Sequence, residues 1–320
     1  MTAKVSFRLM TEADVSATTL VRRSAISWLE RTQVWEPAMS PAQRPIIQHH
    51  FLRTDPEGCW VAVLDGLVMG YAQAWVRGDV WSLAQLFVQP EAHGHGLGEG
   101  ALARAAAYAE ARGARVRCVV ASTSPVAHAL YVRQGMLAAA LGYRLSGPVD
   151  VLRAQREAAS GQRGIVADID ALGPDEIARL IDGRAPLDRE LWGAERRQDH
   201  ALFLDAHNGF EEQAATFTLL EGQKRDDGAL LGYGYAQDDG WFGMLAAREP
   251  ALQLPLMRMT GDWLAERGVE RAHCYVLSHN ATVMTALVGA GWRIDGWSYF
   301  LTSAPFGQFD RYVPSGGMLL

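Results

Sequence analysis

The stretch from Val88 to Gly98 reads Val-Gln-Pro-Glu-Ala-His-Gly-His-Gly-Leu-Gly. It follows an apolar run typical of a strand and precedes an alanine-rich segment, so it predicts a turn from a strand into a helix. Glycines at Gly94, Gly96 and Gly98 let the backbone approach an anion closely. A helix N-terminus adds unpaired N–H groups and about half a positive charge. The stretch therefore predicts a cradle for a pyrophosphate group.

Two other phosphate-binding loops share these features and are excluded by their context. A P-loop needs Lys followed by Ser or Thr after its last glycine, and Gly98 is followed by Glu99 and Gly100. A dinucleotide-binding loop follows a strand that opens a βαβ unit. Here the preceding strand, 80–88, closes a predicted antiparallel meander with turns at Asp65-Gly66 and Gly78-Asp79.

The first half of the chain predicts the element order β, α, α, β, β, β, α, β, α, β. The strands are expected at 5–9, 60–64, 67–76, 80–88, 115–121 and 141–145, and helices at 99–112 and 125–134. Another helix begins after the Thr11 cap, and the proline-containing region 28–52 predicts two short helices joined by a loop.

The length of 320 residues and the 49% hydrophobic content favour two packed domains. We expect domains at 1–146 and 164–320, with a polar linker at 147–163 that contains a helical segment near 150–159. The second half repeats the first: Trp263–Gly268 matches Tyr108–Gly113, and Gly291 matches Gly135, at spacings of 155 and 156 residues.

Charge and composition restrict the partners. The net charge of -6 and the lack of a basic cluster argue against nucleic acid. No apolar run approaches the roughly 18 residues of a membrane span, so a soluble, cytoplasmic protein without a membrane partner is expected. Cys59, Cys118 and Cys274 lie far apart, which predicts buried free thiols and no zinc site or disulfide framework.

A second motif follows the first by about 30 residues: Ser124-Pro-Val-Ala-His-Ala-Leu-Tyr-Val-Arg-Gln-Gly-Met136. Together the two segments resemble the GNAT acetyltransferase superfamily, with its V-x-P-x-x-(Q/R)-G-x-G-x-G/A loop and its N-x-x-A-x-x-L/F-Y-x-x-x-G-F segment. His93 replaces the family's Gln or Arg, and Ser124 replaces its Asn. The resemblance implies an α/β (α+β) protein of two tandem GNAT folds, each with a mixed, mostly antiparallel central sheet flanked by helices.

The resemblance also implies acetyl-CoA as co-substrate, no metal, and a site between two parallel strands. The N–H of Val88 would polarise the thioester carbonyl, His93 would donate to phosphate without a fixed charge, and Tyr131 would protonate the departing thiolate. The residues expected to bind the coenzyme are Leu86, Phe87, Val88, His93, Gly94, His95, Gly96, Leu97, Gly98 and Ser124.

The general base is left unassigned. At positions where family members often carry Glu, this chain has Ala84 and Gln85, which cannot accept a proton. The remaining candidates are a water chain and four side chains, namely Asp79, His49, His50 and His128.

The second copy is expected to be degenerate. A uniform offset of 155 places Glu249, Ala251 and Gln253 opposite the three loop glycines, and Leu287 opposite Tyr131. A carboxylate repels phosphate and a leucine has no proton to give, so the sequence predicts a structural role for this copy, or a wall for the pocket of the first.

The resulting hypothesis is an acetyl-CoA-dependent N-acetyltransferase that acts on a primary amine of a small molecule. Two alternatives stay open: transfer to a protein or peptide amine, and a non-catalytic acyl-CoA-binding regulatory module. The sequence leaves the acceptor, the acyl chain length, and the choice between monomer and homodimer undetermined.

Overall fold

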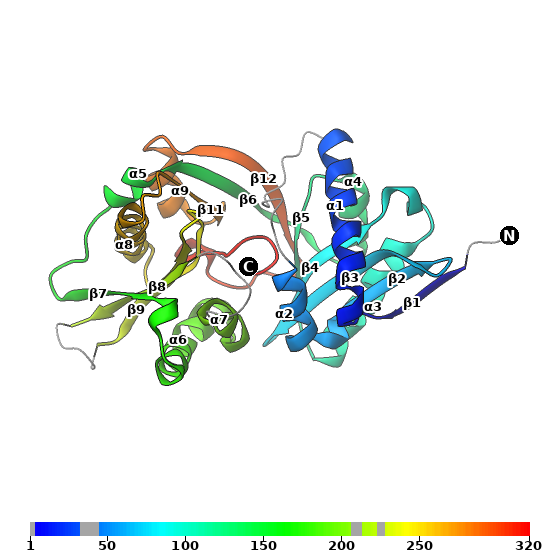
Figure 1. Ribbon diagram of the computed structural model, residues 1–320, viewed down its shortest axis with the longest axis horizontal. Coiled ribbons are helices and arrows are strands. Elements are labelled where there is room, and N and C mark those ends of the chain that lie inside the picture. The colour runs from blue at the N-terminus through cyan, green and yellow to red at the C-terminus, as the bar shows by residue number, and fades with distance from the viewer. Residues whose placement is uncertain (1–3, 33–44, 206–212, 223–227) are drawn as a thin grey trace. The chain divides into compact units, whose positions relative to one another are not determined.

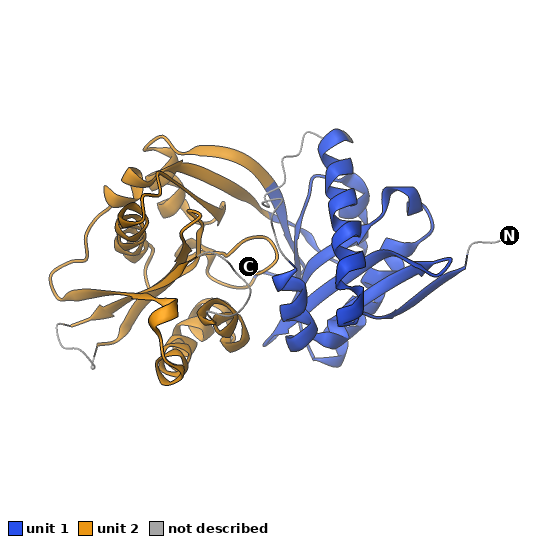
Figure 2. Cartoon of the chain, in the orientation of Figure 1, with its two compact units in different colours: residues 1–139, 298–305 blue, residues 140–297, 306–320 orange. Residues whose placement is uncertain are grey.

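The computed structural model describes residues 4–32, 45–205, 213–222 and 228–320. The chain forms two compact units (Figure 2). Unit 1 comprises Met1–Ala139 together with Ser298–Pro305, and unit 2 comprises Ala140–Trp297 together with Phe306–Leu320. Unit 1 therefore contains a short segment from near the end of the sequence. The expected domains, 1–146 and 164–320, did not include this exchange.

The sheet of unit 1 begins with an antiparallel meander of β1 (Val5–Leu9), β2 (Cys59–Leu64), β3 (Leu67–Arg77) and β4 (Val80–Val88). The β2–β3 hairpin turns at Asp65 and Gly66, whose φ angles of 49° and 84° suit a two-residue turn between twisted strands. Strand β5 (Val116–Ala121) pairs parallel with β4, and the end of β12 (Arg293–Thr302) pairs antiparallel with β5.

Helices cover both faces of this sheet (Figure 1). One face carries α1 (Val15–Thr32), which follows the 3-10 turn η1 (Glu12–Asp14), and α2 (Ile46–Thr54), which precedes η2 (Pro56–Gly58). The other carries α3 (Leu97–Ala111) and α4 (Pro125–Arg133). Ala101, Ala105 and Ala109 recur every four residues on α3 and are fully buried, so small side chains let this helix lie close to the sheet.

One predicted region of unit 1 differs from the structure. The two short helices expected within 28–52 are instead the end of the long helix α1, which runs to Thr32, and helix α2. Residues 33–44, where the connecting loop was expected, lie outside the described residues. The last strand, expected at 141–145, is the longer β6 (Leu137–Pro148).

Unit 2 contains an antiparallel sheet in the order β13-β10-β9-β8-β7. These strands are β7 (Gln162–Asp168), β8 (Ala214–Glu221), β9 (Leu230–Gln237), β10 (Phe242–Ala247) and β13 (Tyr312–Val313). Strand β11 (Arg271–Leu277) pairs antiparallel with β6, and meets the β10 side of the sheet through one isolated parallel bridge, Trp241 to His273.

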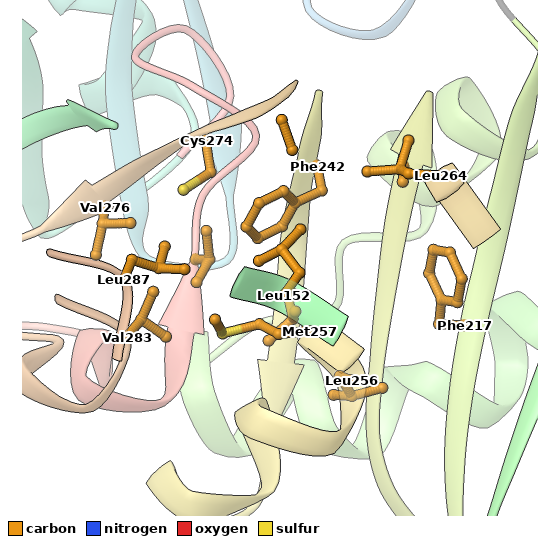
Figure 3. Close-up of a cluster of buried hydrophobic side chains, with 14 of the residues drawn as sticks. Leu152, Phe217, Phe242, Leu256, Met257, Leu264, Cys274, Val276, Val283 and Leu287 are labelled. Carbon is orange, nitrogen blue, oxygen red and sulfur yellow. The ribbon is translucent and has the colours of Figure 1, made fainter. Parts of the chain in front are cut away.

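The helices of unit 2 are α5 (Val149–Arg153), α6 (Pro174–Trp192), α7 (Arg197–Leu204), α8 (Gln253–Glu266) and α9 (Ala281–Val288). Three 3-10 turns accompany them: η4 (Ile169–Ala171), η5 (Pro250–Leu252) and η6 (Phe309–Arg311). Leu152 of α5 packs in one apolar cluster with Met257 of α8 and Leu287 of α9 (Figure 3). Part of the expected linker, 147–163, is thus core of unit 2, because Val149 and Leu152 are buried.

Candidate active site

The sheet of unit 1 splays apart where β4 approaches the glycine-rich loop. The parallel register between β4 and β5 runs only from Val80↔Val116 to Leu83↔Val119. A β-bulge follows, since Gln73 pairs with Gln85 while Ala74 pairs with Leu83. Beyond the bulge β4 continues to Val88 beside β3 alone, so its other edge is unpaired in the described ladder.

The alternation of antiparallel hydrogen bonds decides which backbone groups face this splay. Gln89 N–H donates to the carbonyl of Met69 at 2.8 Å, which makes this a hydrogen-bonded position. Phe87, two residues earlier, is therefore bonded to β3 as well. Leu86 and Val88 direct their N–H and C=O groups away from β3. Of the three strand residues predicted to bind the coenzyme, these two present free backbone groups to the splay.

The glycine-rich loop leads from β4 into α3. After the 3-10 turn η3 (Pro90–Ala92), Gly94 and Gly96 adopt φ angles of 84° and 74°, which L side chains rarely tolerate. Gly96 is the N-cap residue of α3, and no side chain caps this end. Leu97 is buried against Ala62 and Ala92, which anchors the start of the helix. The first N–H groups of α3 are thus left for an anion.

The two histidines of the loop differ in their contacts. The His95 Nδ1 atom lies 3.3 Å from the carbonyl oxygen of Ala92 and 3.2 Å from that of His93, so the ring is turned back onto its own loop. The His93 ring contacts Trp28 of α1 edge-on, with ring centroids 5.1 Å apart. Both histidines are exposed, so their rings are accessible at the loop.

Tyr131 lies on α4 and is 6% exposed. It packs in the apolar cluster of unit 1 that includes Val119 and Ala121 of β5, with Leu86 of β4 against it. Burial raises the pKa of its phenol well above the usual range, so the hydroxyl keeps its proton at physiological pH. Across the described residues no hydrogen-bond partner of this hydroxyl is found, and its proton remains available.

Ser124 occupies the N-cap position of α4. Its Oγ atom accepts a hydrogen bond from the N–H of Ala127 at 3.5 Å. This hydroxyl is therefore already engaged with the helix that carries Tyr131, which fixes the start of α4. If Ser124 also binds the coenzyme, its hydroxyl must do so while it keeps its hydrogen bond to Ala127.

The four proposed base residues are engaged elsewhere or lie at the wrong end of the strand. Asp79 pairs with Arg115 and precedes Val88 by nine residues, roughly 30 Å along a strand. His49 pairs with Glu12, and the Nε2 atom of His128 lies 2.9 Å from the Ser122 carbonyl oxygen. His50 is buried with its ring against Phe51.

A buried amide cluster that the sequence analysis missed lies beneath the splay. Tyr71 of β3 donates its hydroxyl to the Gln85 Oε1 atom at 2.5 Å, and the Gln48 Nε2 atom of α2 lies 3.4 Å from the same oxygen. All three residues are almost fully buried. The only sequence signal for this cluster is the alternation of side chains along β3 and β4, which places Tyr71 and Gln85 on the same face of the sheet.

The loop of the second copy is shorter than that of the first. Pro90 and Pro250 begin equivalent 3-10 turns 160 residues apart, whereas Leu97 and Gln253 begin equivalent helices 156 residues apart. The four residues 93–96 of the first copy therefore have no counterpart. This corrects the uniform offset, which had set Glu249, Ala251 and Gln253 opposite the three glycines.

Leu287 does stand where Tyr131 stands in the first copy. Asn280 caps α9 as Ser124 caps α4, and Leu287 follows Asn280 by the same seven residues. Leu287 is fully buried beside Val283 and Val276 (Figure 3). A proton donor is absent at this position of unit 2.

A sheet that splays beside a glycine loop and an uncapped helix is the arrangement that the resemblance to GNAT acetyltransferases leads one to expect. Residues 22–136 match the family model described as Acetyltransferase (GNAT) family. Unit 1, which contains residues 22–136, therefore carries a GNAT-family domain. This match supports acyl transfer as the general activity of unit 1.

Solved structures share the fold over nearly the whole chain. A proposed acetyltransferase from Pyrococcus horikoshii is 13% identical, with a TM-score of 0.67 over 96% of this chain and 92% of that one. A tandem GNAT protein from the clavulanic acid biosynthesis pathway is 16% identical, with a TM-score of 0.62 over 94% and 99%. A GCN5-related N-acetyltransferase from Sphaerobacter thermophilus is 17% identical, with a TM-score of 0.60 over 96% and 98%. No curated protein sequence matches the chain.

Two further features of the described residues bear on ligands. None of their helices is long and apolar enough to cross a membrane. Nor do the described ranges contain a group of three or more His, Cys, Asp or Glu side chains that could hold a metal ion.

Proposed function

We propose that unit 1 is an acetyl-CoA-dependent N-acetyltransferase that acts on the primary amine of a small molecule. The observation that carries the proposal is the splay of β4. There Leu86 and Val88 offer free backbone groups, and the chain passes directly into the glycine loop and the uncapped start of α3. Backbone donors on a strand suit the amides of an extended pantetheine arm, and the helix start suits its pyrophosphate.

The reaction is a direct transfer. The amine nitrogen attacks the thioester carbon, the carbonyl oxygen gains negative charge, and the C–S bond then breaks. The N–H of Val88 is proposed to bind the developing oxyanion, a contribution of about 3 kcal/mol in comparable sites. Holding amine and thioester side by side supplies a further large part of the rate.

Tyr131 is proposed as the general acid. Its buried, protonated hydroxyl would donate the proton that the departing thiolate takes up, and the phenol would regain a proton from solvent. The amine proton is proposed to leave through water, since Ala84 and Gln85, at the positions where a base is expected, cannot accept a proton. A hydroxyl that makes no other hydrogen bond can donate to the departing thiolate without first breaking one.

Coenzyme binding is tested by calorimetric titration of the full chain with acetyl-CoA, recording affinity and stoichiometry. The proposal requires one site per chain. Catalysis is tested by release of free coenzyme A thiol in the presence of a panel of small primary amines, with Tyr131→Phe as the control variant.

The same two assays separate the competing functions. Thiol release with peptides or proteins and with no small amine would move the acceptor to a macromolecule. Tight binding with no thiol release for any acceptor would make the chain a binding module. A cytoplasmic location and the choice of acetyl over longer acyl groups remain predictions.

A further inference from the structure

The splay of unit 2 differs from that of unit 1 because the chain's own backbone fills it. Strand β13 pairs antiparallel with β10, matching Leu245 with Val313 and Ala246 with Tyr312. It also packs against β11, which is bridged to the β10 side of the sheet at Trp241 and His273. The segment Phe309–Leu320 thus inserts a strand where unit 1 leaves an edge unpaired.

The paired edge is the equivalent of the open edge in unit 1. Arg248 N–H donates to the Leu231 carbonyl at 2.8 Å, as Gln89 does to Met69. Leu245, three residues before Arg248, is therefore in the same phase of the hydrogen-bond ladder as Leu86, three residues before Gln89. The backbone groups of Leu245 that face away from β9 are therefore those that β13 engages.

Two buried amide side chains hold the inserted backbone from the other side. Asn280 donates its Nδ2–H to the carbonyl of Tyr312 at 3.2 Å, and Gln253 donates its Nε2–H to the carbonyl of Asp310 at 3.0 Å. The same two amides bond each other at 2.6 Å, and both are fully buried. These bonds go to main-chain oxygens, one in the 3-10 turn η6 and one in β13, so they depend on the path of the backbone rather than on a particular side chain.

The rest of the segment is fixed as firmly. Trp241 donates its indole N–H to the Ser315 carbonyl at 3.1 Å. The buried Arg196 guanidinium donates to the Tyr312 hydroxyl at 2.5 Å and to the Leu320 carbonyl. Leu319 and Leu320 are both buried. An acyl-CoA molecule that bound along the same edge of β10 would have to displace β13.

We propose that the donor cleft of unit 2 is a strand-docking groove for a peptide backbone, and that its occupant is strand β13, held in place by the rest of the chain's own segment Phe309–Leu320. The groove lacks the counterpart of residues 93–96, so it has lost the phosphate cradle and gained a peptide ligand in its place. The mode is β-strand addition to an open sheet edge.

The test uses hydrogen exchange followed by mass spectrometry on the full-length chain. In Gly243→Ala the new Cβ would lie 2.6 Å from the Pro314 carbonyl oxygen and 2.7 Å from the Trp241 ring, so the segment has to move. Gly234→Ala on β9 is the matched control, since its Cβ meets only Leu245 at 3.5 Å or more. Asn280→Ser copies Ser124 and removes the amide donor while keeping a cap for α9.

Wild type should show slow exchange across 310–316. Asn280→Ser removes the amide donations to Tyr312 and Gln253, and Gly243→Ala introduces a clash with Pro314. Each variant should speed exchange there by about tenfold or more, while α8 stays protected and Gly234→Ala matches wild type. The proposal fails if 310–316 exchanges like a free peptide in wild type, or if Asn280→Ser leaves its exchange unchanged. It also fails if saturating coenzyme A releases the segment, since the cleft would then bind coenzyme.

Discussion

The amide of Asn280 donates to the main-chain carbonyl of Tyr312 at 3.2 Å while its Oδ1 atom accepts the N–H of Val283 at 3.1 Å. Asparagine can do both because it carries an acceptor and two donors. Ser124, at the same cap in the first copy, has its single hydroxyl turned to Ala127. The two copies therefore share a helix cap and differ in whether the cap also holds a strand in the splay.

Replacing Tyr131 by Phe should lower kcat by about a hundredfold, the lower range for loss of a general acid, and leave the affinity for acetyl-CoA unchanged. The hydroxyl has no partner among the described residues, so the apolar packing of the ring persists. Steady-state thiol release measures kcat, and calorimetry measures affinity. A variant with wild-type kcat would remove Tyr131 from the mechanism.

Replacing Gly96 by Glu should abolish detectable acetyl-CoA binding, because it adds a carboxylate and backbone strain at the N-cap of α3. Gly113→Glu is the matched control. Gly113 follows the C-terminus of the same helix, with φ of 69° against 74°, and both positions have open space for a Cβ. Calorimetry on both variants distinguishes the effect of backbone strain from the loss of the coenzyme site. Equal loss of binding in both would argue against a coenzyme site at Gly96.

Asp14 links the stability of unit 1 to pH. The bidentate Arg8 guanidinium, at 2.6 and 2.7 Å, lowers the pKa of this carboxyl from 3.8 to about 2, helped by Thr11. A lowered carboxyl pKa stabilises the fold at pH above the unfolded value of 3.8, and the gain disappears as pH falls through the folded value of about 2.

Asp14→Asn should accordingly cost about 1–2 kcal/mol of unfolding free energy at pH 7, since the half-exposed Arg8 is partly screened by solvent. At pH 2, where the folded carboxyl is about half protonated, most of this difference should be lost. Urea titrations at both pH values provide the measurement. A cost that is the same at pH 2 and pH 7 would mean that packing, and not charge, is lost.

Leu287→Ala should destabilise unit 2 by about 2–4 kcal/mol, because it opens a cavity in a core where the leucine is fully buried. It should leave acetyl-CoA affinity in unit 1 unchanged if that unit alone binds coenzyme. Thermal unfolding with calorimetry reports both quantities. Val288→Ala, one residue on and 37% exposed, is the control and should cost under 1 kcal/mol.

The first half of the fold was largely predictable because its signals are local. Strands β1 and β4 have the predicted bounds, and α3, β5 and α4 lie within two residues of theirs. The region 28–52 was predicted less well. Helix α1 continues past Trp28 to Thr32, where the sequence analysis expected a separate short helix. The prolines later in this region do not mark the end of α1, because the packing of the helix on the sheet decides how far it extends.

The candidate site divides in the same way. The glycines and Tyr131 can be recognised from residue type and spacing along the chain. The structure adds the positive φ angles of Gly94 and Gly96 and the burial of Tyr131. The pairing of Gln85 with Tyr71 and Gln48 joins residues that lie up to 37 positions apart, so no local pattern contains it.

The sequence by itself determined the tandem repeat, the glycine loop before α3, and the replacement of Tyr131 by Leu287 in the second copy, because each is a matter of residue type and spacing. Only the tertiary structure decided that Leu86 and Val88, rather than Phe87, face the splay, and that Phe309–Leu320 fills the splay of unit 2. Strand pairing is non-local: partners such as Leu245 and Val313 are 68 residues apart and are selected by the edge left open once the sheet has formed.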